Sequence, residues 1–394
     1  MTGIEGKAAI TGVGMSQIGR MTQRPAMDHL LDAALEAMAQ AGLSRDDIDG
    51  ITTYPGKANN APGMSPLGVG EVRNALGLKT RWHSGGGEGA AQMTPLMVAA
   101  MAVATGQARH VLVFRALTES SSQTPERRAS VATGGSDRVG GWLSWLLPMN
   151  ALSASNWTAM FATRHMQEFG LTREHLGTQA IIQRDNAMLN PRAVFQKPLT
   201  MDDYLGARMI SSPLGLFDCD IPIDGACVII VSAMDAARDL RQVPLAIEAF
   251  GAGMRSPESW DQRADLTTMG AHDAAADMWS RTDLKPKDVD ILSLYDGFSI
   301  YVPMWLEAFG FCEHGGAGEF IANGNTRRDG KFPVNTGGGQ LSAGRLHGFG
   351  LLHEACIQLW RIAGERQVAD ASTAVCGMGG GPLAGAMLIQ RTAI

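Results

Sequence analysis

The stretch LSRDDIDGITTYPG, residues 43–56, decides the fold because it returns in the second half of the chain. Residues 284–297 read LKPKDVDILSLYDG, with the Asp-x-Asp and the Tyr-x-Gly in step. We interpret this match as an internal duplication that gives Tyr54 and Tyr295 equivalent positions. The alternative is that two ordinary helix–loop–strand units share a common pattern.

The segments around the two copies also follow one order. A β-rich run (7–14) precedes a helical pattern (26–42) and the first copy, then come a glycine-led helix from 85 and the run HVLVFRAL. The same order returns from PLAIEAFGAG (244–253) to AGAMLIQR (384–391). This alternation predicts an α/β fold with halves at 1–120 and 245–394. Residues 121–244 differ in texture and are interpreted as a loop domain inserted over the active site.

Composition excludes several classes of protein. The 394 residues carry a net charge of −6 and no long basic run, which argues against nucleic acid as a partner. No apolar stretch reaches the roughly 18 residues of a membrane span. The five cysteines form no CxxC pair and no zinc-like spacing with histidine, so we expect no metal site and reduced, buried thiols. The default location is the cytoplasm, and the short GVG near residue 12 lacks the full dinucleotide-binding fingerprint.

Motifs in the middle of the chain indicate which protein family it resembles. Residues 183–231, QRDNAMLNPRAVFQKPLTMDDYLGARMISSPLGLFDCDIPIDGACVIIV, carry Asn-Pro, Pro-Leu-Thr, Ser-Pro-Leu and Asp-Gly-Ala in succession. This order resembles the sterol-carrier-protein type of thiolase, and the resemblance runs the whole length of the chain. It implies a five-layer αβαβα fold built from two similar halves.

The departures from that family indicate the chemistry. A thiolase uses a cysteine nucleophile at the N-terminus of a buried helix, where backbone N–H groups stabilise the thiolate. Ser84 aligns with that cysteine in WHSGGGEGAA. Ser84 either caps the helix, with only its backbone N–H acting, or attacks as a nucleophile, which requires a base beside it.

Three further motifs are altered. In the loop GGGQLSAGRLHGFG (337–350), Arg345 replaces the family's histidine and His347 follows two residues later. The motif that is His-Asp-Cys-Phe in the sterol-carrier branch reads YDGF here, headed by Tyr295. Cys376 stands one residue from the second catalytic cysteine position, as either an acid or a packed strand residue. Arg345 either pairs with a carboxylate to hold the loop or touches the substrate.

The pattern as a whole resembles the lipid-transfer-protein-type aldolases of bacterial steroid side-chain degradation, which carry a second tyrosine where this chain has His347. The resemblance implies retro-aldol cleavage of a β-hydroxyacyl-CoA to a ketone and a short acyl-CoA. Tyr295 and His347 would then be the proton-transfer pair. Backbone N–H groups at Ser84, Gly380 and Gly381 would hold the thioester oxygen.

Two other functions stay open at this stage. One is a thiolase-type acyltransferase that uses Ser84 or Cys376, and the other is a non-catalytic acyl-CoA-binding subunit. The resemblance also implies a homodimer and a separate OB-fold or zinc-ribbon partner in a hetero-oligomer. No cofactor is expected beyond the CoA thioester of the substrate.

Overall fold

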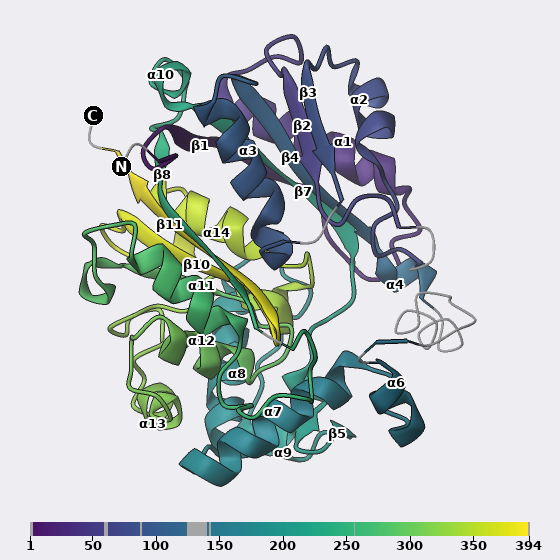
Figure 1. Cartoon of the computed structure of the whole chain (residues 1–394), viewed down its shortest axis with the longest axis vertical. Coiled ribbons are helices and arrows are strands. Elements are labelled where there is room, and N and C mark those ends of the chain that lie inside the picture. The colour runs from purple at the N-terminus through teal and green to yellow at the C-terminus, as the bar shows by residue number, and fades with distance from the viewer. Residues whose placement is uncertain are drawn as a thin grey trace.

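The computed structural model describes residues 3–58, 62–86, 89–123, 140–141, 143–255 and 257–392 (Figure 1). Eleven strands and the main helices follow in chain order: β1 Ala8–Met15, α1 Ala26–Ala41, β2 Gly50–Thr53, α2 Val69–Leu76, β3 Trp82–Gly85, α3 Thr94–Ala104, β4 His110–Thr118, α4 Glu119–Ser122, α6 Leu143–Leu146, α7 Ala154–Phe169, α8 Arg173–Met188, α9 Met201–Leu205, β5 Met209–Ser211, β6 Leu214–Gly215, β7 Asp224–Ala233, α10 Met234–Ala237, β8 Leu245–Met254, α11 Gly270–Trp279, β9 Ile291–Leu294, α12 Tyr301–Ala308, α13 Ala317–Ala322, α14 Phe349–Leu359, β10 Thr373–Gly380 and β11 Leu383–Arg391.

The strand order confirms the internal duplication. One nine-stranded sheet runs β3-β2-β4-β7-β1-β8-β11-β10-β9. In the first half β2 is parallel to β4, and the pairs β4–β7 and β7–β1 are antiparallel. In the second half β9 is parallel to β10, and β10–β11 and β11–β8 are antiparallel. Tyr54 and Tyr295 therefore each follow the second strand of their half, as the sequence predicts.

In each half, a pair of glycines on one strand lets a helix pack closely against the sheet. A Cβ on Gly12 or Gly14 of β1 would lie 2.4 or 2.1 Å from a carbonyl oxygen of α1. On β8, a Cβ on Gly251 or Gly253 would lie 1.9 or 2.0 Å from a carbonyl oxygen of α11. The GVG near residue 12 is thus a helix-packing feature, because only glycine permits so close an approach.

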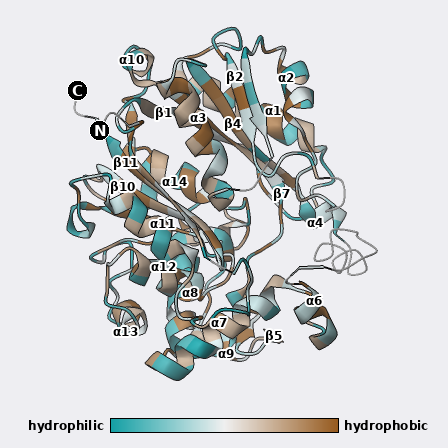
Figure 2. Cartoon of the chain, in the orientation of Figure 1, coloured by the Kyte–Doolittle hydropathy of each residue, from teal (hydrophilic) through white to brown (hydrophobic). Residues whose placement is uncertain are grey.

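Three hydrophobic cores hold the five layers together. The first lies between α1, α2 and the strands β2, β4 and β7. The second holds residues of α3 and α14 between the two halves of the sheet, and the third joins β9, β10 and β11 to α11 and α12. The central helix α3 is apolar almost all round: it buries Leu96, Ala99 and Val103 in the core and leaves Met101 exposed, and Figure 2 colours it and much of β4 as hydrophobic. The expected αβαβα layering is confirmed.

One domain boundary needs correction. The strand β7 lies within the segment 121–244, yet it pairs with β4 and β1 at the centre of the first half. The inserted segment therefore ends before residue 224, and its described helices α7 and α8 pack on the second half through the third core. An apolar strand that returns to an earlier sheet looks, in sequence, like part of the insertion that precedes it. Within the described ranges no helix has both the length and the apolar character of a membrane span.

Candidate active site

The helix that would carry a thiolase nucleophile begins later than the sequence predicts. Ser84 lies in β3, where it pairs with Thr52 of β2, and α3 is preceded by a 3-10 turn that starts at Ala91. The placement of Ser84 at the helix start is therefore wrong. β3 ends at Gly85, and residues 89 and 90 form a bend directly before that turn. Ala91 begins that turn with φ +49° and packs against Gly379, so the turn that leads into α3 starts with a methyl group where a thiolase carries its cysteine.

This placement gives the first prediction. Ser84→Ala is expected to keep kcat within a few-fold of wild type. Ser84 lies in a strand, so its hydroxyl is neither the nucleophile nor a helix cap. Steady-state turnover of a cleaved acyl-CoA substrate measures this. An acyl ester trapped on Ser84 and recovered by mass spectrometry would contradict it.

The loop 337–350 is wrapped around a buried carboxylate. Asp296, the second residue of YDGF, accepts hydrogen bonds at Oδ2 from the backbone N–H of Gln340 at 2.8 Å and of Leu341 at 3.3 Å. The side-chain amide of Gln183 on α8 donates to the same oxygen at 2.5 Å. Burial raises the pKa of Asp296 to about 6. The loop thus joins YDGF to the inserted segment.

Glycine makes this contact possible. The residues from Gly339 to Ala343 form a short π-helix, a form that recurs at functional sites, between Gly338 and Gly344 with φ +101° and +126°. A Cβ on Gly339 would lie 2.0 Å from Gln183 Nε2 and 2.1 Å from Asp296 Oδ2. The close approach predicted for this loop is confirmed.

We expect Gly339→Ala to lower the free energy of unfolding by at least about 2 kcal/mol, because strain at positive φ adds to a steric clash. The matched control is Gly364→Ala, which has φ +66° but no neighbouring atom within 4 Å of the added Cβ. Urea unfolding of both variants separates the clash from the backbone strain. Equal losses would contradict the close packing at Gly339.

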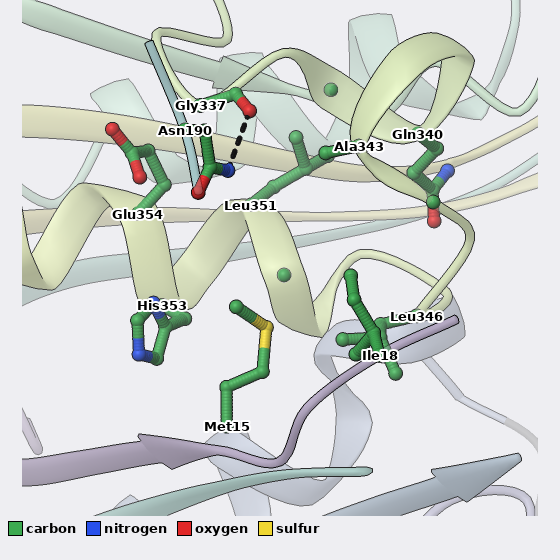
Figure 3. A pocket seen from close by; sticks show the side chains of 13 residues that line it. Met15, Ile18, Asn190, Gly337, Gln340, Ala343, Leu346, Leu351, His353 and Glu354 are labelled. Carbon is green, nitrogen blue, oxygen red and sulfur yellow. Dashed lines mark hydrogen bonds between the residues drawn. The ribbon is translucent and has the colours of Figure 1, made fainter. Parts of the chain in front are cut away.

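The other face of the loop lines a small cavity (Figure 3). Its volume is about 30 Å³, and Met15, Ile18 and Leu346 lie on one side of it. Asn190 Nδ2 donates to the carbonyl oxygen of Gly337 at 2.8 Å and fixes the start of the loop. This cavity has room for little more than a water molecule, so it is not the substrate site.

Arg345 pairs with two carboxylates. Its Nε and Nη2 each lie 2.9 Å from Glu119 Oε2, and its Nη1 lies 3.0 Å from Asp220 Oδ1. Of the two roles considered for Arg345, the structure shows the carboxylate pairing. Burial opposes its charge, but Asp220 and Glu119 outweigh burial and raise the pKa of Arg345. Arg345 therefore ties the loop to the end of β4 and to the segment before β7.

Asp220 is the titratable member of this group near neutral pH. Burial raises its pKa to about 7, which the nearby Arg345 only partly offsets. Tyr295 lies close enough for the Asp220 charge to act on its phenol, and burial together with that charge raises the pKa of Tyr295. Tyr295 is consequently a neutral phenol, beside a carboxyl group that exchanges its proton near pH 7.

His347 is a neutral hydrogen-bond donor in this arrangement. Its Nδ1 lies 2.7 Å from Arg115 Nη2, and since arginine only donates, Nδ1 accepts and Nε2 carries the proton. Burial and then the charges of Arg115 and Arg345 hold the pKa of His347 well below its usual value. His347 is therefore the weaker candidate for the base of the predicted proton-transfer pair, and its role in catalysis stays a prediction. Its φ of +48° is an uncommon value for a residue larger than glycine.

The remaining predicted residues occupy β10 and the turn after it. Cys376 is fully buried, and burial raises its pKa to about 12, so it is a packed strand residue and not a proton donor. A Cβ on Gly380 would meet the ring of Tyr301, and one on Gly381 the ring of Trp260. Both glycines thus allow close packing at the end of the strand, and their oxyanion role stays a prediction.

Sequence reasoning missed Arg115, Glu119, Asp220 and Asp296. The signal for Arg115 was present, since the run VLVFRAL within β4 is otherwise apolar and this strand is buried on both faces. A charged residue in such a strand must meet a polar partner or a ligand. Asp220 and Glu119 had no comparable signal, because their importance depends on Arg345 from the other half.

Comparison with known proteins agrees with this geometry. A model of the thiolase C-terminal domain-like family matches residues 252–390. The chain is 35% identical to 17-hydroxy-3-oxo-4-pregnene-20-carboxyl-CoA lyase of Mycobacterium tuberculosis over 90% of this chain and 92% of the relative. It is 35% identical to a steroid side-chain-cleaving aldolase of Thermomonospora curvata over 98% of this chain and 99% of the relative.

The solved structures give the same result. The Ltp2-ChsH2(DUF35) aldolase superposes with a TM-score of 0.87 and 31% identity, and the match covers 98% of each chain. Fold and matches together define an enzyme of the thiolase superfamily. Within that superfamily, the chain belongs to the thiolase-like aldolases.

Proposed function

We propose that this enzyme cleaves a β-hydroxyacyl-CoA with a steroid- or sterol-like side chain by a retro-aldol reaction. The products would be a ketone and a short acyl-CoA, such as propionyl-CoA or acetyl-CoA. Two observations together carry the proposal: the turn that leads into α3 starts with an alanine, Ala91, and the partly buried Tyr295 lies near Asp220 at the carboxyl end of β9. Thiolytic cleavage needs a nucleophile, whereas retro-aldol cleavage needs only a base, an acid and donors for an enolate.

The base in this proposal is Asp220. Its ionised carboxylate removes the β-hydroxyl proton as the hydroxyl carbon becomes a ketone. The bond between the α- and β-carbons breaks, and its electrons form the enolate of the thioester. A carboxyl group with a pKa of about 7 matches the requirement that a catalytic base titrate near the working pH.

The acid in this proposal is Tyr295, which gives its proton to the α-carbon of the enolate and then regains one from the protonated Asp220, so that both groups return to their starting states. A phenol whose pKa is raised by burial keeps its proton until a stronger base, such as a carbanion, forms beside it. His347 contributes its Nε2–H as a donor to the substrate and not as a base. Backbone N–H groups of Gly380 and Gly381 are proposed to share the thioester oxygen.

We also propose a homodimer that works with a separate OB-fold or zinc-ribbon protein in the cytoplasm. Support comes from the structural relative, whose name joins an Ltp2 chain to a ChsH2(DUF35) chain. The five unpaired cysteines suit a reducing compartment. Size-exclusion chromatography with light scattering, on the chain alone and with candidate partners, tests the assembly.

Product analysis tests the reaction. The enzyme, with and without a partner, is supplied with a β-hydroxyacyl-CoA and a β-ketoacyl-CoA, each with and without free CoA. Release of ketone and short acyl-CoA from the hydroxy compound without added CoA is expected. Activity confined to the keto compound with CoA would instead indicate an acyltransferase, and binding without turnover a non-catalytic subunit.

A further inference from the structure

Arg115 is an unusual residue for its place in the fold. It lies in β4, whose residues from His110 to Leu117 are buried, and only 1% of its own surface is exposed. Burial lowers its pKa to about 10, so it is still charged at neutral pH. A charge in such a place requires strong compensation.

The compensation seen in the structure is incomplete. Nη2 donates to His347 Nδ1 at 2.7 Å, but Nε and Nη1 have no hydrogen-bond partner among the described residues. The charge of Glu119 acts on Arg115 from nearby, but no carboxylate in the described ranges forms an ion pair with Arg115, and Glu119 Oε2 bonds Arg345 instead. Arg345 shows what a structural arginine looks like here, since both ends of its guanidinium meet carboxylates.

The surroundings of Arg115 belong to both halves. Tyr54 and Tyr295, the two residues made equivalent by the duplication, are both near enough for their phenols to interact electrostatically with its guanidinium. His347 comes from the loop 337–350. Arg115 therefore lies near the proposed proton-transfer groups, and two of its N–H donors, Nε and Nη1, have no partner among the described residues.

We propose that Arg115 is a catalytic residue whose free N–H groups bind the thioester oxygen as negative charge develops on it. The proposal rests on the retro-aldol function, in which the electrons of the broken carbon–carbon bond move onto that oxygen. A guanidinium in a site screened from water stabilises such charge strongly, because it is fixed before the reaction begins. By donating to Nδ1, Arg115 also keeps the proton of His347 on Nε2, so both residues present donors.

The charges near the site fit this role. Arg115 and Arg345 are cations, Glu119 is matched to Arg345, and His347 is neutral. When Asp220 has taken the substrate proton it is neutral as well. One positive charge then remains uncompensated, and the enolate supplies the matching negative charge.

Two reactions test the proposal in the assembled enzyme. One is cleavage of the β-hydroxyacyl-CoA, and the other is exchange of the α-protons of propionyl-CoA with D₂O, which needs enolate formation but no carbon–carbon cleavage. Arg115→Gln is expected to lower kcat for cleavage and the rate of exchange by a similar factor, roughly 10²–10³. KM should change little, because the ground-state carbonyl carries little charge. Arg115→Lys should recover part of the loss.

The control is Arg263→Lys, at a partly buried arginine whose Nη2 donates to the carbonyl of Thr268 outside the site. If the wild type cleaves the substrate and Arg115→Gln does so with the same kcat, the inference about Arg115 is overturned and the retro-aldol proposal stands. Arg115-dependent exchange without any cleavage by the wild type would overturn the retro-aldol proposal and support the arginine. Absence of both reactions in the wild type would overturn both.

Removing a buried charge can prevent folding, so one measurement uses the wild type. A solved structure with an amide analogue of the substrate, in which nitrogen replaces the thioester sulfur, is expected to show its carbonyl oxygen within hydrogen-bond distance of Nε or Nη1 of Arg115. A carbonyl oxygen bound elsewhere in the site would overturn the inference.

Discussion

Replacing Tyr295 with phenylalanine is expected to lower kcat by roughly 10²–10⁴, the usual loss for one proton-transfer group. The ring stays in place, so packing against Tyr301, whose ring centroid lies 6.1 Å away, should be retained. Only the phenolic proton is lost. The variant should unfold at the same urea concentration as wild type and bind acyl-CoA equally well, as steady-state kinetics and calorimetry would show.

The matched control is Tyr301→Phe. That hydroxyl is bonded to Thr158 at 2.7 Å, so removing it should cost about 1 kcal/mol of stability and leave kcat within a few-fold of wild type. Full turnover in Tyr295→Phe would show that Tyr295 is a packing residue. Equal losses in both variants would point to a general disturbance of the aromatic cluster.

The second large effect is expected at Asp220. Asp220→Asn removes the proposed base with almost no change in shape, and kcat at pH 8 should fall by roughly 10²–10⁴. In the wild type, kcat should rise with pH through about 7, where Asp220 ionises. The variant should lose that rising limb. A pH–rate profile with an unchanged limb in the variant would assign the base to another group.

The Asp220→Asn substitution should lower kcat without lowering the free energy of unfolding. Because the pKa of Asp220 is about 7 in the folded protein and ordinary when unfolded, ionising it in place disfavours the folded state, increasingly as pH rises from about 4 to about 7. Asp220→Asn carries no such charge, and Arg345 keeps its pairing with Glu119. The variant should therefore be no less stable than wild type at pH 8. A clear loss of stability there would indicate that the Asp220–Arg345 pair is mainly structural.

The duplication, the layers and the strand ends were predictable because they follow local patterns. Tyr295 ends an apolar run, and the glycines of residues 337–350 indicate that the backbone of this loop approaches another part of the chain closely. The start of α3 was not predictable, since it depends on the packing of Ala91 against Gly379, which comes from the other half. The predicted C-terminal boundary of the insertion was wrong because β7 pairs with β4 and β1 only in the tertiary fold, which local sequence patterns do not show.

The state of His347 could not be predicted for a related reason. A histidine in a glycine-rich loop suggests a base with a pKa near neutrality, but burial in the fold, together with the charges of Arg115 and Arg345, lowers the pKa of His347. The same holds for Asp220, whose pKa depends on how deeply the final packing buries it. Sequence patterns indicate which residue types are present, whereas electrostatics depends on which of them the fold brings together.

The contact between Arg115 and His347 joins residues separated by 232 positions, one from each half. Neither half can contain the site alone, so an N-terminal fragment that has just left the ribosome is a folded scaffold at most. Activity would appear only after the last third of the chain has docked. Contacts of such long range also slow folding, because a large loop must close before they form. Co-expressed fragments divided between β7 and β8 should thus regain turnover only as they associate, and their rate of association could be followed by the appearance of product.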